Sequence, residues 1–101
     1  MERDNLFNLY VEAYFGVREM DEYDLKEYVL KDIENYIKDF VYTNDIDINY
    51  AKENAERIKD KVNIKTKLQS SLILLNKMNA PEELILLVRK KIKNIDEKER
   101  K

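Results

Sequence analysis

The chain has 101 residues and a net charge of −2, which suits one domain with its own apolar core and leaves little room for a second. Hydrophobic residues make up 44% and charged residues 40%, with one Gly and one Pro, so helices are favoured over a turn-rich sandwich or barrel. The absence of Cys excludes disulfides and thiolate metal sites, and the absence of His removes the usual general base.

The first predicted helix covers residues 5–19, where bulky apolar and aromatic side chains leave a narrow polar side marked by Asn8 and Glu12. Gly16 is expected to end this helix, although the alternative is a longer helix that contains it and reaches Met20. The wide aromatic surface is expected to be either core or a docking face for another chain.

The second predicted helix covers residues 24–42 and has the most regular apolar pattern. Asp24 and Glu27 have the spacing of a capping box at its start. The apolar residues recur at steps of four, four, three and four, as expected for a helix of about five turns. They are Leu25, Val29, Ile33, Tyr36 and Phe40.

A polar loop at residues 43–48 precedes the third predicted helix, at 48–62, which Asp47 or Asn49 can cap. The apolar stripe of this helix breaks after Val62. We therefore predict a tight turn at Asn63–Thr66 and a fourth helix at 65–78, with one kinked continuous helix as the alternative.

The fourth helix and a fifth, at 81–96, hold the densest apolar material. Leu72–Leu75 and Leu84–Val88 are consecutive runs that would cover most of a helix circumference, so we expect both helices to lie in the middle of the fold. Pro81 suits the first turn of the fifth helix. The last residues, 96–101, are charged and are expected to fray.

Together these patterns predict an all-α protein: a compact bundle of four to five helices in which residues 1–101 form a single helical domain. No apolar run is long enough to span a membrane, and the first residues do not resemble a secretion signal, so we expect a cytoplasmic protein.

Charge is divided unevenly along the chain. Residues 1–50 contain five basic and thirteen acidic side chains, whereas residues 51–101 contain fourteen basic and eight acidic ones. The two halves can neutralise each other by packing, or the basic half can bind phosphates of a nucleic acid. The candidate phosphate-binding residues are Lys61, Lys65, Lys67, Arg89, Lys90, Lys91 and Lys93.

Protein binding is the preferred functional hypothesis. Tyrosine suits both the margin of a core and the centre of an interface, and all seven tyrosines lie in the acidic half, with Tyr50 as its last residue. An aromatic, acidic surface would suit a basic partner protein, and a homo-oligomer is a further expectation. The candidate partner-binding residues are Phe7, Tyr10, Tyr14, Tyr28 and Tyr36.

Catalysis is not expected, because Ser70 and Ser71 have no imidazole partner and no paired acids lie in an apolar setting. No cofactor or metal is expected either. The spacing of Asp45, Asp47, Asn49 and Glu56 resembles an EF-hand calcium loop, but Tyr50 replaces the required Gly, which favours a polar loop with a helix cap.

Overall fold

The computed structural model describes residues 3–21 and 24–99. Within these residues it contains helices and connecting turns and no strand, which confirms the predicted all-α bundle. Each observed boundary lies within three residues of its predicted position. The helices are α1 (Arg3–Arg18), α2 (Lys26–Thr43), α3 (Ile48–Lys61), α4 (Ile64–Lys77) and α5 (Glu82–Glu99).

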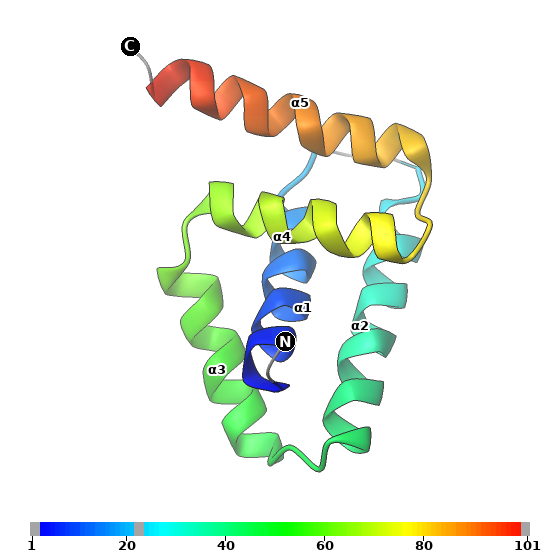
Figure 1. The fold of residues 1–101 in the computed structure, drawn as a ribbon, viewed down its shortest axis with the longest axis vertical. Helices are drawn as coiled ribbons and strands as arrows, with labels where there is room; N and C mark the ends of the chain where they lie inside the picture. Colours follow the sequence, from blue (N-terminus) through cyan, green and yellow to red (C-terminus); the bar gives the residue numbers. More distant parts are fainter. Residues whose placement is uncertain (1–2, 22–23, 100–101) are drawn as a thin grey trace.

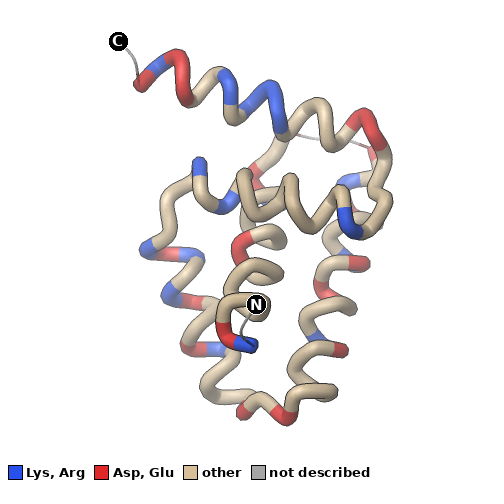
Figure 2. Tube along the Cα trace, in the orientation of Figure 1, with Lys and Arg blue, Asp and Glu red and all other residues tan. Residues whose placement is uncertain are grey.

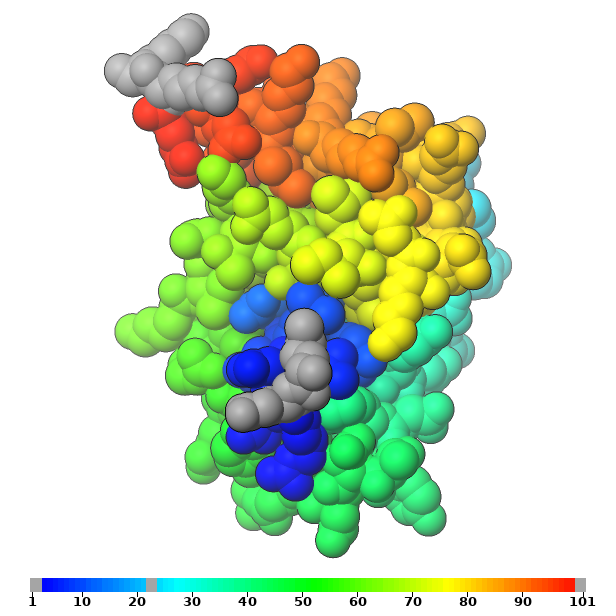
Figure 3. All heavy atoms as spheres, in the orientation of Figure 1, coloured from blue at the N-terminus to red at the C-terminus, as the bar shows by residue number. Residues whose placement is uncertain are grey.

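Helix α1 lies at the centre of the fold. It packs against α2, α3 and α4, whereas α5 packs mainly on α4. Figure 1 shows α1 between α2 and α3, with α4 crossing the upper end of this group and α5 running alongside α4. In the space-filling view, α4 covers the upper part of the visible face and α5 forms its upper edge (Figure 3).

The prediction that the last two helices form the middle is therefore wrong for α5. This helix buries one face, with Leu84 and Val88 fully enclosed, while Leu86 and Leu87 are 52% and 41% exposed. Even on α4, Ile73 is 57% exposed. A run of apolar residues covers every side of a helix, but burial also needs neighbouring helices on every side, and α5 has one main neighbour.

Gly16 lies inside α1 instead of ending it, which corrects the first expectation for this residue. A Cβ atom built on Gly16 would lie 2.0 Å from the Ser71 Oγ and 2.5 Å from the Lys67 carbonyl oxygen. The Ser71 hydroxyl is directed at the Ala13 carbonyl (2.8 Å) and at the Lys67 carbonyl (2.9 Å). The missing side chain therefore lets the backbones of α1 and α4 approach closely.

The turns that end α2 and α4 use residues other than glycine. Asp45 and Asn79 have positive φ angles, of 52° and 56°. In both turns the amide of the following residue donates to the carbonyl five positions earlier, at 2.9 Å and 3.0 Å, which is the Schellman arrangement. After the first turn the following residue, Ile46, is buried and ties this end of the molecule to the core.

Side-chain caps separate α3 from its neighbours. Asp47 accepts a hydrogen bond from the Tyr50 amide at 3.0 Å, which confirms one of the two predicted caps. Asn63 accepts from the Thr66 amide at 2.8 Å, so α3 and α4 are two helices with a tight turn between them. The kinked single helix is excluded.

The predicted capping box at the start of α2 does not form. Leu25 occupies the N-cap position without a side-chain cap, and the helix begins at Lys26. The Lys26 ammonium donates to the Met20 carbonyl at 2.8 Å, just beyond the end of α1. This bond fixes how the chain enters α2, and the helix starts two residues later than the Asp24 spacing predicted.

Polar side chains of α1 connect it to its neighbours. Asn8 accepts a hydrogen bond from Asn54 of α3 at 2.7 Å, and Glu12 accepts one from Ser70 of α4 at 2.6 Å. Among the described residues every buried side-chain nitrogen or oxygen has a hydrogen-bond partner. The narrow polar side predicted for this helix is therefore half-buried against α3 and α4 and helps to orient α1.

Candidate functional site

An open groove lies between α2 and α3, with α1 as its floor. The two helices diverge from the turn at residues 44–47 and do not pack closely on each other (Figure 1). Two hollows, with volumes of about 260 Å³ and 890 Å³, adjoin here and share the lining residues Ile37, Ala51 and Lys52, and α1 supplies the floor of the smaller one. We call these two adjoining hollows the α2–α3 groove.

Small residues on α3 keep the groove open. Ala51 and Ala55, with Lys52, are the α3 side chains that line its narrower part, where Ile37 lies on α2. Alanine is too short to fill the space between two diverging helices, so the groove reaches down to apolar side chains of α1, of which Tyr14 and Phe15 are half-buried while Phe7 and Val11 are buried. Those floor residues are Phe7, Val11, Tyr14 and Phe15.

Exposed apolar side chains stand at the wide end of the groove. Tyr42 is 88% exposed and Ile48 is 58% exposed, and both line the larger hollow together with Val41. Exposed apolar side chains beside an apolar hollow are typical of binding sites for other molecules. The groove is therefore the candidate functional site.

The predicted partner-binding aromatics do not form one surface. Phe7 and Tyr10 are 1% and 6% exposed, so they belong to the core and do not offer the docking face that was expected of them. Packing of α1 against α2, α3 and α4 explains this burial. Phe7 nevertheless forms part of the buried floor of the groove.

The other three aromatics lie on two sides of α2. Tyr14 is half-buried and lines both the groove and an adjoining hollow, where Tyr28 is 71% exposed. Tyr36 packs edge-on against Tyr10, with ring centroids 6.1 Å apart, away from the groove. The sequence did not identify Tyr42, Ile48 and Ala51 as site residues. The small alanines in the apolar stripe of α3 could have indicated that this side of the helix leaves space beside α2.

Two of the predicted phosphate-binding lysines are bound internally. Lys67 is 4% exposed, and its ammonium donates to the Lys59 carbonyl at 2.8 Å, at the end of α3. Glu19 lies 3.6 Å from the same ammonium. Lys67 therefore supplies a donor and a positive charge at a helix C-terminus, which corrects its assignment to a phosphate site.

Lys65 has a similar internal role. It forms salt bridges with Asp96 and with Glu99, the latter at 3.7 Å, which link α4 to the last turns of α5. The hydrogen bond with Asp96 raises the pKa of Lys65 above its ordinary value. Because the folded pKa is raised, the contribution to stability is complete at neutral pH and is lost as the pH rises beyond that ordinary value, 10.5. Helix α5 continues to Glu99, beyond its predicted end at residue 96, and these contacts connect its last turns to α4.

Replacing Lys67 by Met tests its role as a helix cap. Met keeps most of the apolar stem but leaves the Lys59 carbonyl without its donor, so we expect the free energy of unfolding to fall by about 1–2 kcal/mol. The matched control is Lys61→Met, because Lys61 is exposed on α3. Urea unfolding should separate the two variants, and equal stabilities would contradict the capping role.

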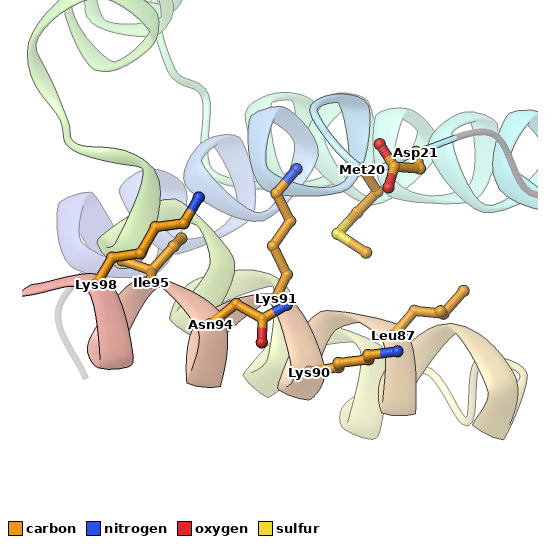
Figure 4. A pocket seen from close by; sticks show the side chains of 8 residues that line it. All are labelled: Met20, Asp21, Leu87, Lys90, Lys91, Asn94, Ile95 and Lys98. Atoms are coloured by element: carbon orange, nitrogen blue, oxygen red, sulfur yellow. The ribbon is translucent and has the colours of Figure 1, made fainter.

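The remaining basic candidates lie mostly on α5. Lys90 and Lys91, together with Lys98, line a hollow of about 430 Å³ whose apolar side chains include Met20 and Leu87 (Figure 4). The Lys91 ammonium donates to the Glu19 carbonyl at 3.0 Å, beyond the end of α1. The remaining three candidates are exposed and are not brought together with Lys65 and Lys67; they are Lys61, Arg89 and Lys93.

The calcium-like spacing at the start of α3 is used for helix capping. Asp47 caps α3, while Asn49 and Glu56 lie within the helix. No group of three or more acidic side chains in the described ranges is arranged to hold a metal ion. The helices of residues 3–21 and 24–99 also lack the combination of length and apolar character that crossing a bilayer requires. No family model, curated protein or solved structure matches this chain.

Proposed function

We propose that this chain acts by binding another protein, and that the α2–α3 groove receives one amphipathic helix of that partner. The observation that supports this most directly is the pair of adjoining, mainly apolar hollows between α2 and α3, the smaller of which has α1 as its floor. Helix-in-groove recognition places the apolar face of a guest helix in such a groove. In this fold the guest would contact α2 and α3 from the side opposite α1.

The shape of the groove favours a helix over other ligands. The α3 residues that line it run from Ile48 to Ala55, which corresponds to about two helical turns, so a guest segment of about two turns would match it. Ala51 and Ala55 allow the close approach of a second helix. A small metabolite would need several convergent polar groups to fix its orientation, and the narrow part of the groove offers mainly apolar side chains.

Charges at the rim indicate which guest would fit. On the α2 wall Glu34 and Lys38 already pair with each other at 3.3 Å. Lys52 lies on the α3 wall, and Asp45 lies at the wide end. We therefore expect a guest whose apolar stripe is flanked by an acidic residue toward α3 and a basic residue near the turn.

Ala51→Arg is the variant that tests this proposal. A long charged side chain on the α3 wall of the narrow part should block the guest and reduce binding at least tenfold, because binding would then have to desolvate a charge where it now buries apolar surface. Glu53→Arg is the matched control, since it introduces the same side chain on the exposed, opposite side of α3. The measurement is capture of partners from a native extract, followed by titration of the partner identified.

A partner retained by wild type and Glu53→Arg but lost by Ala51→Arg is the expected result. Light scattering on the purified chain distinguishes one special case: a dimer that becomes a monomer in Ala51→Arg would identify a second copy of the chain as the guest. A partner that binds all three proteins equally would contradict the groove as the binding site. Thermal unfolding of each variant shows that the fold is retained.

A further inference from the structure

The outer face of α5 carries a combination of side chains that the fold does not use. Leu86 and Leu87 are 52% and 41% exposed, and the following residues include exposed Arg89, Lys90 and Lys93. Leu86, Lys90 and Lys93 recur at steps of four and three, so they share one face of the helix. Figure 2 shows the basic positions gathered in the middle of α5, with acidic positions toward both ends.

Packing does not explain these side chains. The inner face of α5, with Leu84, Ile85 and Val88, already joins the helix to the core. Within residues 3–21 and 24–99, no acidic side chain forms a salt bridge with the three exposed cations of the outer face, and the α2–α3 groove lies elsewhere. Apolar and cationic groups that lie side by side on an exposed helix face suit a surface that offers both kinds of contact.

We infer that α5 binds the surface of an anionic lipid bilayer. The ammonium and guanidinium groups would meet lipid phosphates and carboxylates, while the two leucines reach the boundary of the acyl chains, which is how interfacial helices bind. Lys90 and Lys98 also stand at the hollow with Leu87 and Met20, where an anionic headgroup can enter, although Asp21 opposes it there (Figure 4). The exposed acidic residues Glu82, Glu83 and Glu97 flank this stretch and would be repelled by an anionic surface, so the contact is confined to the middle of the helix and binding is weak and reversible.

A bilayer fits this face better than a nucleic acid does. Binding of single strands relies on aromatic side chains that stack on bases, and α5 contains no Phe, Tyr or Trp. Against a phosphate backbone Leu86 and Leu87 would remain in water. The basic half is also short of free cations for a duplex, because Lys65 and Lys67 are held by internal partners.

The test is sedimentation of the full chain with vesicles of phosphatidylcholine mixed with phosphatidylserine, compared with vesicles of phosphatidylcholine. We expect binding to the anionic vesicles that falls as salt is raised. Lys90→Gln combined with Lys93→Gln should lower the partition coefficient by roughly 30-fold, because each basic residue at an anionic surface changes it by about fivefold. Leu86→Ser combined with Leu87→Ser should also weaken binding without changing the net charge.

Lys59→Gln combined with Lys61→Gln is the control, since it removes the same charge from the exposed surface of α3. Equal loss in this control would mean that net charge, not α5, governs binding, and it would overturn the inference. Absence of binding to the anionic vesicles would overturn it as well. Binding to single-stranded RNA without binding to vesicles would assign the face to a nucleic acid instead.

Discussion

Gly16→Ala is expected to destabilise the protein by about 2 kcal/mol, the opposite of its effect on an exposed helix. On an exposed helix the same change stabilises by about 0.5–1 kcal/mol. Here the added methyl would lie 2.5 Å from the Lys67 carbonyl oxygen. This is a backbone atom, so the clash can be relieved only if α1 and α4 move apart. For a domain of this size the melting temperature should fall by roughly 10 °C.

Two further variants locate the cause of this loss. Gln69→Ala changes an exposed position on α4 and should leave the melting temperature nearly unchanged. Ser71→Ala in the Gly16→Ala background removes the nearer obstacle, the hydroxyl at 2.0 Å, but leaves the carbonyl in place. It should therefore restore little stability. A Gly16→Ala protein as stable as wild type would show that α1 and α4 do not approach as closely as described.

Leu74→Ala and Ile73→Ala should differ in stability by about 2.5 kcal/mol although the two residues are neighbours. Leu74 is fully buried, so its truncation leaves a cavity and should cost about 3 kcal/mol. Ile73 is 57% exposed, so its truncation should change the stability by at most about 0.5 kcal/mol. Denaturant unfolding of both variants measures the difference.

This pair also tests the orientation of α4. If α4 were buried on every side, as its run of apolar residues predicted, both variants would be strongly destabilised. Equal losses would therefore contradict the arrangement in which α4 has one exposed side. Leu86→Ala on α5 extends the comparison, and we expect it to resemble Ile73→Ala because Leu86 is also about half exposed.

The helices themselves could be predicted from the sequence because their signals are local. Apolar periodicity gave α2, and the Asp47 cap marked the start of α3. The break after Val62 correctly separated α3 from α4, where Asn63 supplies the cap. These features depend on residues within a few positions of one another.

The packing could not be predicted in the same way, because it depends on residues far apart in the chain. Gly16 was read as a helix end, whereas its role is set by Ser71 and Lys67, more than fifty positions later. Lys67 was read as a surface cation, whereas the end of α3 and Glu19 surround it. The α2–α3 groove arises from the divergence of two helices, which no local pattern reveals.

Hydrogen exchange of the chain in complex with its captured partner tests the proposed function most directly. Protein binding in the groove predicts added protection in the second half of α2 and the first half of α3, on both walls around Ile37 and Ala51. The exchange of α5 should be unchanged by this partner. Protection confined to α5, with the amides on both walls exchanging as in the free chain, would contradict the groove as the site of binding.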